Sequence, residues 1–551
     1  MRRAARLLVL LPGFLLLLPV AAPAQTVRIC AIQGSGPTPD MLGSRVSTSG
    51  VVTADLQASL GGFFMQEPGC DADASTSDGI FVSTLARPTP VTVGNRVTVT
   101  GRVTNDAGLT AIEAESVGES GPYAGSLETV RLSPPADALA AAAYLEAYED
   151  MLVSLPPSRV VAATDHTGTS YVLPESSGVT RLYRGDTDGR KLGLAAPAGW
   201  LTLSQGDRVS DVTGILVESS GQFKVVIPPA RSLTLERSGL MPPEAGSLST
   251  ATLSVATYDL ESLFDPVDDP GKDDAVPTPD QYAAGLGRRA TSIARYLGLP
   301  DVLGVQQVEK IEVLQDLAAQ PALLPASYRA VLMEGIDPRG LDVGLLYNSE
   351  RLWLRSAEAR QACSAVRPPD GPLISCALSG GSSGYMLFTR PPLVVRLEAL
   401  DNHERLTVVV NHLKSPSGDT AADDRVRVAQ ADEVRSLVDE LKASEADVPV
   451  IVLGDLNAFE DSAPLQHLTS TGRLVNLIVR AGAERPYSHA VQGLCELPDH
   501  VLVDGALVPR VAELRAVHVN VDFADPGPSA PPEASPRASE HDPVRLLLTR
   551  P

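Results

Sequence analysis

The sequence predicts one or two small all-β barrel modules followed by a larger α/β domain. In the first half of the chain, short strand-like runs are separated by glycine, proline and aspartate, which is typical of small antiparallel barrels. From about residue 250 onward, apolar runs alternate with segments of helical periodicity. This alternation indicates an α/β domain whose sheets are buried.

The chain begins with the three parts of an export signal. Three arginines within the first six residues precede an apolar run from Leu7 to Val20, and the small residues Ala22-Pro23-Ala24 come next. This arrangement defines a signal peptide, so residues 1–24 are expected to be removed from a secreted or periplasmic protein. An apolar run of about 14 residues is too short to cross a bilayer, and no membrane partner is expected after cleavage.

The composition argues against nucleic-acid binding through overall charge. Lys and Arg number 45, Asp and Glu number 67, and the formal net charge is −22. Proteins that bind nucleic acid tightly through charge usually present a basic face. A bound divalent cation can supply positive charge locally, so the acidity does not exclude an enzyme that acts on nucleic acid.

Five cysteines are present, and export makes disulfides possible. Cys30 with Cys70 and Cys363 with Cys376 are the expected pairs, because each pair lies within one predicted domain. Cys495 is left over, and the spacing alone leaves other pairings open. No Cys-x-x-Cys motif or histidine cluster indicates a zinc site.

Residues 25–120 are expected to form the first barrel, and residues 121–245 a second β-rich, barrel-like module. The second stretch repeats the first weakly, since Gly206-Asp207-Arg208-Val209 echoes Gly94-Asn95-Arg96-Val97. A segment containing proline and glycine, residues 240–248, is expected to link the second module to the α/β domain. Strands of the first barrel are expected at 46–52, 62–65, 79–82 and 95–100.

Residues 250–551 are expected to form the α/β domain. Helices are expected at 278–298 and 423–443, and the second places Val434, Leu437, Val438 and Leu441 on one stripe. Strands are expected at six apolar runs: 253–258, 302–305, 343–347, 406–410, 448–453 and 544–548.

Polar residues gather where these strands end. A carboxylate at a strand end, taken singly, is more often a turn residue or helix cap than a ligand. Acid, amide and imidazole groups that converge on one rim of a sheet favour a hydrolytic site. Such a set can supply a base for water, ligands for a cation and donors for phosphoryl oxygens. The set comprises Asp259, Gln307, Asn411, His412, Asp455, Asn457, Asp499, Glu540 and His541.

Eight motif-like stretches recur through the α/β domain: VATYDLESLF (255–264), DVLGVQQVE (301–309), DPRGLDVGLLY (337–347), FTRPPL (388–393), VNHLKS (410–415), GDLNA (454–458), PDHVL (498–502) and SEHDPV (539–544). In order and spacing they resemble the endonuclease/exonuclease/phosphatase superfamily, and within it secreted bacterial nucleases with an N-terminal oligonucleotide-binding (OB) type barrel. The resemblance implies a four-layer α/β sandwich, in which helices flank two central sheets and the site lies at one end.

The resemblance also implies catalytic roles. His541 is similar to the base that activates water, and Asp499 to the residue that holds it. His412 resembles the histidine that contacts the phosphate and protonates the leaving oxygen, with Asp342 to orient it.

Two further pairs have implied roles. Asp455 and Asn457 resemble the pair that positions the nucleophile and the phosphoryl oxygens. Asn411 and Arg339 resemble phosphate contacts. The resemblance to secreted nucleases implies a nucleic acid as substrate.

The implied cation site contains Asp259, Gln307 and Glu540, where the family usually has Asn, Glu and Asp. The family also usually has Asn where this chain has Ser262 and Lys310. The expected cation is Mg²⁺, with Mn²⁺ or Ca²⁺ as alternatives, yet an amide at 307 lacks the charged oxygen that Mg²⁺ favours. One interpretation is decay of the site. The other is compensation, in which residues 259 and 307 have exchanged one negative charge.

Three functions are consistent with these observations. The leading hypothesis is a secreted, divalent-metal-dependent nuclease that hydrolyses phosphodiester bonds of extracellular DNA or RNA. A second is a phosphodiesterase or phosphatase that acts on a smaller phosphate ester. A third is a catalytically silent relative whose barrels bind nucleic acid or polysaccharide. Phe63, Phe64 and Phe81 are expected to form barrel core rather than a stacking surface.

Overall fold

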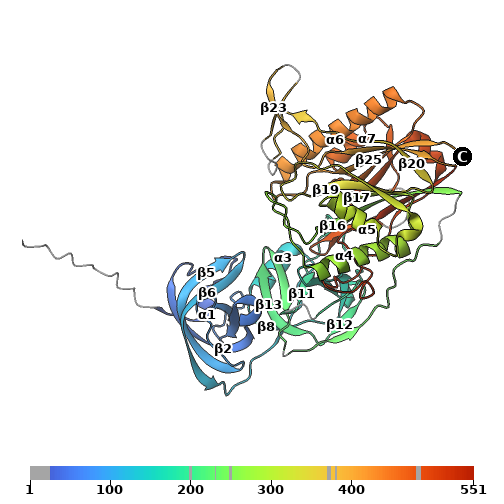
Figure 1. Ribbon diagram of the computed structural model, residues 1–551. Coiled ribbons are helices and arrows are strands. Elements are labelled where there is room, and N and C mark those ends of the chain that lie inside the picture. The colour runs from blue at the N-terminus through green and yellow to red at the C-terminus, as the bar shows by residue number, and fades with distance from the viewer. Residues whose placement is uncertain are drawn as a thin grey trace, which may run out of the picture. The chain divides into compact units, whose positions relative to one another are not determined.

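The computed structural model describes residues 25–197, 201–229, 231–246, 251–368, 374–378, 381–478 and 485–550. The predicted signal peptide lies outside these residues. The described chain forms two compact units, shown in Figure 1. Unit 1 contains residues up to Val130 together with Ala143–Val153 and Ile215–Gly221, and unit 2 contains Arg131–Ala142, Ser154–Gly214 and the chain from Gln222 onward.

Five strands of unit 1 pair in a closed ring of order β2-β3-β4-β6-β5, because β5 also pairs with β2. Neighbouring strands are antiparallel except β4 and β6, which are parallel. Phe63, Phe64 and Phe81 are buried. The elements are β1 (Gln25–Thr26), α1 (Ile29–Gln33), β2 (Arg45–Leu56), α2 (Gln57–Leu60), β3 (Gly62–Gln66), β4 (Gly79–Ser83), β5 (Asn95–Asp106) and β6 (Leu109–Pro122).

The ring is the small barrel that short strands and frequent turns predict, and its assignment as an OB-type module remains a prediction. Four elements have residues in both units, so the range 121–245 is shared between them rather than forming one block. They are β7 (Val130–Arg131), α3 (Ala138–Glu146), β8 (Leu152–Ser154) and β13 (Thr213–Ser219).

Unit 2 begins with β-rich segments, residues 154–214 and 222–246, which we call the β module. Six of its strands are neighbours in the order β15-β12-β9-β10-β11-β14. A short 3-10 helix, η1 (Glu175–Ser177), comes directly after β10. The strands are β9 (Ser158–Ala162), β10 (Thr169–Pro174), β11 (Leu192–Ala195), β12 (Arg208–Ser210), β14 (Gln222–Val226) and β15 (Thr234–Glu236).

The rest of unit 2 contains two six-stranded mixed sheets, with orders β18-β19-β17-β16-β32-β31 and β20-β24-β25-β26-β30-β27. Strands of the first are β16 (Thr252–Leu263), β17 (Val302–Val308), β18 (Tyr328–Leu332), β19 (Asp342–Asn348), β31 (Val511–Ala516) and β32 (Val544–Thr549). Strands of the second are β20 (Leu352–Ala359), β24 (Leu393–Ala399), β25 (Arg405–His412), β26 (Val450–Asp455), β27 (Leu474–Asn476) and β30 (Asp499–Asp504).

Helices cover the outer faces of these sheets (Figure 1). Successive residues of a strand point to opposite faces, so Val408 and Val410 join the core between the sheets while Val409 packs with α6 and α7. Ala256 and Tyr258 of β16 pack with α4 and α5 on the other side. The elements are α4 (Pro279–Thr291), η3 (Ser292–Tyr296), α5 (Ile311–Ala318), η4 (Leu324–Ala326), α6 (Thr420–Ser444), α7 (Ala463–Thr469) and η6 (Gly505–Arg510).

The four-layer arrangement confirms the predicted fold class, and both predicted helices are present. Helix α4 begins at a capping box, in which Thr278 accepts from the backbone of Gln281 and the Gln281 side chain accepts from the backbone of Thr278. The remaining strands form a three-stranded sheet and a hairpin. They are β21 (Cys363–Ser364), β22 (Ser375–Ala377), β23 (Ser383–Met386), β28 (His489–Val491) and β29 (Leu494–Glu496).

Both predicted disulfides are present, Cys30–Cys70 and Cys363–Cys376, and Cys495 is a buried free thiol. Within the described ranges, no helix combines the length and apolar character that a membrane span requires.

Thiol labelling of the disulfide-bonded protein is expected to modify one cysteine, Cys495, when the protein is denatured without reductant. Each bridge contributes about 3 kcal/mol to stability in the chain-entropy model. Mass analysis after alkylation checks the count, and a reduced sample, in which five cysteines become reactive, is the control. Three or more labelled thiols without reductant would exclude the observed pairing.

Candidate active site

Strand register brings the candidate residues of β25, β26 and β30 together. Strands β25 and β26 are parallel, with His412 opposite Asp455, and β26 runs antiparallel to β30, with Asp455 opposite Asp499. Gly454 has a φ of 136°, and a Cβ there would lie 1.9 Å from the carbonyl oxygen of Asn411. Glycine therefore permits the close approach that sets these side chains beside one another.

His541 and Asp499 form a hydrogen-bonded pair. Nδ1 of His541 lies 2.7 Å from Oδ2 of Asp499, and the Ser488 hydroxyl donates to the same oxygen at 2.7 Å. Burial alone would lower the pKa of His541, but the charge and hydrogen bond of Asp499 raise this pKa well above its usual value. The contact leaves Nε2 as the ring nitrogen for proton transfer.

The loop before β32 is tied to β16, which fixes His541 relative to Asp259. The Ser539 hydroxyl donates to the carbonyl oxygen of Asp259 at 2.7 Å and accepts from the backbone N–H of His541 at 3.1 Å. A single serine thus connects the predicted base to the predicted cation site.

His412 is buried beside Asp455 and Arg390. Nη1 of Arg390 donates to Nδ1 of His412 at 3.2 Å, and Nε2 of His412 lies 3.4 Å from Oδ2 of Asp455. Burial lowers the pKa of His412 well below its usual value, and the charge of Arg390 lowers it further. A neutral His412 that accepts at Nδ1 carries its proton on Nε2.

Asp342 is placed differently from the expectation that it orients His412. Its Oδ1 accepts from the backbone N–H of Gly335 at 2.7 Å, and burial raises its pKa to about 7. The group beside His412 is Arg390, which sequence reasoning missed although it belongs to the FTRPPL stretch. An arginine inside a motif whose other residues are all uncharged was the available signal.

Asp455 and Asn457 lie together, as predicted. The backbone N–H of Asn457 donates to Oδ1 of Asp455 at 2.8 Å, and its side-chain amide donates to Oδ2 at 3.0 Å. Asn457 has a φ of 45°, a conformation that asparagine tolerates better than most residues. Burial raises the pKa of Asp455 well above its usual value, and the nearby charge of Asp499 adds to the shift.

The two predicted phosphate contacts, Asn411 and Arg339, offer different chemical groups to a ligand. The amide nitrogen of Asn411 donates to the carbonyl oxygen of Val409 at 2.9 Å, so its oxygen, which is buried without a partner, faces elsewhere. An amide oxygen suits a cation or a hydroxyl donor better than a phosphate oxygen. The side chain of Arg339 is 47% exposed and can reach an anion outside the sheet.

Asp259 and Gln307 are hydrogen-bonded to each other. Nε2 of Gln307 donates to Oδ1 of Asp259 at 2.7 Å, and the amide oxygen of Gln307 accepts from Ser262 at 3.1 Å. Oδ2 of Asp259 is buried and has no hydrogen-bond partner. The pair therefore presents one carboxylate oxygen and carries one negative charge.

Glu540 is engaged by other residues. Its Oε1 is bonded to Nδ1 of His166 and lies 3.6 Å from Nη2 of Arg537. Glu540 is therefore separate from the one group of three potential metal ligands found among the described residues. That group consists of Asp259, His412 and Asp455, whose ligand atoms all lie within 4.8 Å of one another.

A divalent cation fits this group, which is a candidate metal site. Oδ2 of Asp259 has no hydrogen-bond partner, and burial together with the charge of Asp499 disfavours the negative charge of Asp455. A bound cation would compensate for both, because hard cations favour carboxylate and amide oxygens. The unpartnered amide oxygen of Asn411 precedes His412 in the same strand.

His489 is a second residue that the sequence did not indicate. Its ring stacks on that of His541, with centroids 4.4 Å apart and planes 18° apart, and its Nδ1 lies 3.1 Å from Glu496. The hairpin of β28 and β29 therefore supports the predicted base from the side.

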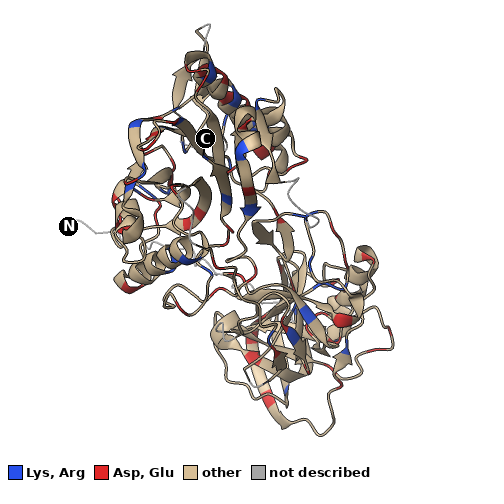
Figure 2. Cartoon of the chain, turned by 90° about the vertical axis from the view of Figure 1, so that its right-hand side faces the viewer, with Lys and Arg blue, Asp and Glu red and all other residues tan. Residues whose placement is uncertain are grey.

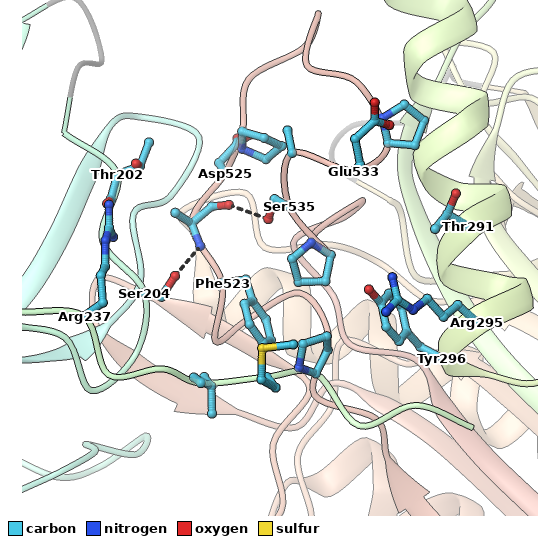
Figure 3. A pocket seen from close by; sticks show the side chains of 18 residues that line it. Thr202, Ser204, Arg237, Thr291, Arg295, Tyr296, Phe523, Asp525, Glu533 and Ser535 are labelled. Carbon is cyan, nitrogen blue, oxygen red and sulfur yellow. Dashed lines mark hydrogen bonds between the residues drawn. The ribbon is translucent and has the colours of Figure 1, made fainter. Parts of the chain in front are cut away.

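A cavity of about 560 Å³ lies elsewhere, between β-module segments and the residues around η3 (Figure 3). Arg237 and Ser204 line it from the β module, and Tyr296, Phe523 and Ser535 from the α/β domain. None of the candidate residues lines this cavity, so the cavity is distinct from the candidate active site. Figure 2 shows basic and acidic residues mixed along the chain.

Comparisons with known proteins agree with this domain assignment. Residues 254–508 match the Endonuclease/Exonuclease/phosphatase family. No curated protein matches the chain.

Similar solved structures cover a little over half of this chain at low identity. A family protein from Bacteroides thetaiotaomicron has 16% identity over 56% of this chain and 96% of its own, with a TM-score of 0.36. A mannosyl-6-phosphatase from the same species has 17% identity over 54% and 99%, with a TM-score of 0.36. The human Nocturnin catalytic domain has 16% identity over 56% and 98%, with a TM-score of 0.35. Over residues 254–508, the chain is therefore similar to the endonuclease/exonuclease/phosphatase family.

Proposed function

We propose that the protein is a secreted, divalent-metal-dependent nuclease that hydrolyses phosphodiester bonds of extracellular DNA or RNA. The observation that carries the proposal is the His541–Asp499 pair, whose histidine is tied through Ser539 to the acidic group at Asp259. The family match over residues 254–508 supports hydrolysis of a phosphate ester. The signal-like start of the sequence and the two disulfides support an extracellular location.

Asp259 and Asp455 would hold the cation, because Nδ1 of His412 accepts from Arg390 and its Nε2 carries the proton. A bound divalent cation stabilises negative charge on phosphoryl oxygens and lowers the pKa of water. The unpartnered amide oxygen of Asn411 is a further candidate donor in the same group.

His541 acts as the base in the proposed reaction. Its Nε2 takes a proton from water while the water oxygen forms a bond to phosphorus, and Asp499 stabilises the imidazolium that results. The phosphorus–oxygen bond to the leaving group breaks in the same displacement. His412, neutral and protonated on Nε2, donates a hydrogen bond to a phosphoryl oxygen, and the leaving oxygen takes its proton from water.

Cleavage assays test this proposal. Mature protein is incubated with supercoiled plasmid and with RNA, in Mg²⁺, Mn²⁺ or Ca²⁺ and with a chelator as control. Nicking or degradation that requires the metal is the expected result. A His541→Ala protein, purified identically, controls for a contaminating nuclease.

The two alternatives predict other outcomes. Hydrolysis of small phosphate esters without cleavage of either polymer would identify a phosphatase or phosphodiesterase of narrower substrate. Binding of single strands without any hydrolysis would identify a silent relative.

A further inference from the structure

The backbone around His541 is held on both sides, whereas the hydrogen bond to Asp499 alone does not fix the plane of the imidazole ring. The hydroxyl of Ser539 accepts from the backbone N–H of His541 at 3.1 Å, and the carbonyl oxygen of Ser488 accepts from that of Asp542 at 2.6 Å. At the ring, Asp499 holds Nδ1 at 2.7 Å. A single hydrogen bond still lets the ring tilt, because the torsion between Cβ and an imidazole ring is broad. Such a tilt moves Nε2, which has to meet the attacking water.

The ring of His489 supplies a contact that sets this plane. Its centroid lies 4.4 Å from that of the His541 ring, and the two planes are 18° apart. His489 has its own anchor, since its Nδ1 lies 3.1 Å from Oε1 of Glu496, the residue directly opposite it in the hairpin of β28 and β29. The side chains of His489 and His541 are only 16% and 11% exposed, so little space is left for either ring to leave the stack.

The same hairpin segment also holds Asp499. Ser488, which directly precedes His489, is buried, and its hydroxyl donates at 2.7 Å to Oδ2 of Asp499. This is the oxygen that is bonded to His541. Two consecutive residues therefore contact both members of the His541–Asp499 pair, one through a hydrogen bond and the other through a ring face.

The β module holds the turn of the hairpin, at the end away from the paired residues His489 and Glu496. Nζ of Lys191 donates to the carbonyl oxygen of Gln492 at 2.7 Å. Gly493 has a φ of 81°, and a Cβ there would lie 2.6 Å from Cγ of Tyr171 in β10, so the turn packs closely on that ring. All of these residues belong to unit 2, within which the β module thus supports the hairpin.

We propose that His489 is a positioning residue of the general base, carried by a hairpin that the β module holds in place. By stacking on the ring of His541, it fixes the plane of that ring and thereby the direction of Nε2. The stack also favours the imidazolium that forms when His541 accepts a proton, because an aromatic face attracts a cation. The inference rests on the proposed role of His541 as the base. It gives the β module, which precedes the family match at 254–508, a part in the active site.

Replacement of His489 by alanine and by phenylalanine tests this role, with kcat and KM measured separately on the substrate that the parent hydrolyses. His489→Ala is expected to lower kcat by roughly 3- to 10-fold, which corresponds to the loss of one aromatic pair, and to leave KM near that of the parent. His489→Phe keeps an aromatic ring but cannot transfer a proton, and it should restore most of the lost kcat. Thermal unfolding establishes that each variant is folded.

A second measurement needs no substrate. In protein with isotope-labelled histidine, the proton between Nδ1 of His541 and Asp499 should give a downfield NMR resonance that is absent from His541→Ala. A ring that tilts opens this hydrogen bond more often, so the resonance should broaden through exchange with water in His489→Ala and persist in His489→Phe. His403→Ala is the matched control and should change neither kcat nor the resonance, because His403 pairs with Glu398 at 2.9 Å in another histidine–glutamate contact.

A parent-like kcat together with an unchanged resonance in His489→Ala would overturn the proposal. A folded His489→Phe protein that is as slow as His489→Ala would also overturn it, because His489 would then act through its nitrogens rather than through stacking. If the resonance depends on His489 in a protein that cleaves neither DNA nor RNA, the positioning role stands and the nuclease assignment alone fails.

Discussion

Replacement of His541 by alanine is expected to lower turnover by roughly two to four orders of magnitude and to leave the fold intact, as removal of a general base does. Nδ1 of His541 is held by Asp499, so the alanine variant loses the only ring oriented by that carboxylate in the described site. Steady-state cleavage of plasmid or RNA measures the loss. Circular dichroism and thermal unfolding establish that the variant is folded.

The pH dependence of activity in an Asp499→Asn variant tests the same His541–Asp499 pair. The charge of Asp499 is what raises the pKa of His541 against the effect of burial, so its removal should lower that pKa. The acidic limb of the kcat/KM profile is therefore expected to move to lower pH, with a lower maximum. His467→Ala is the control, since His467 pairs with Asp432 at 3.0 Å near α7, away from the site. Full activity of His541→Ala would require another base.

Asp259→Asn is expected to abolish metal-dependent cleavage, because it removes the one negative charge that Asp259 and Gln307 present together. Loss of several kcal/mol of charge stabilisation corresponds to a rate decrease of about two orders of magnitude or more. Gln307→Glu places a second carboxylate within hydrogen-bonding distance of the first. It should tighten metal binding yet slow cleavage, since the site must also admit an anionic phosphate.

The double variant Asp259→Asn/Gln307→Glu keeps the hydrogen bond and reverses its direction, because the new asparagine can donate to the new glutamate. It should be at least as active as the parent, and the two changes should be strongly non-additive. Metal titration and plasmid cleavage of the four proteins measure this coupling. An inactive parent that gains activity from Gln307→Glu alone would instead establish decay of the site.

Periodicity was sufficient to predict most of the α/β domain. Alternation in β25 assigns Val408 and Val410 to one face and Val409 to the other, and the structure places them in separate cores. The stripe on α6 is likewise buried. These predictions succeed because the spacing of apolar residues within one strand or helix determines which of its faces is buried.

The contacts between distant segments could not be predicted in this way. His166 contacts Glu540 from a turn that follows Thr164, whose carbonyl oxygen accepts from Arg537 and from the backbone N–H of Asp525. Backbone hydrogen bonds leave no side-chain pattern, so these contacts between the β module and the α/β domain have no local signal in the sequence. The sequence predicted Asp342 as the neighbour of His412, but the structure has Arg390 there. The conformation of the loop before β24 decides this contact, and it too has no local signal in the sequence.

Gly454 sets a limit on how the site can change during evolution. Any side chain at this position would collide with the backbone of Asn411 and push β25 and β26 apart where His412 and Asp455 leave the sheet. Exchange of an acid and an amide between Asp259 and Gln307 needs no backbone movement, because their hydrogen bond tolerates either direction. Mutations can therefore move negative charge between positions 259 and 307 of the cation site, whereas position 454 between the two strands must remain glycine.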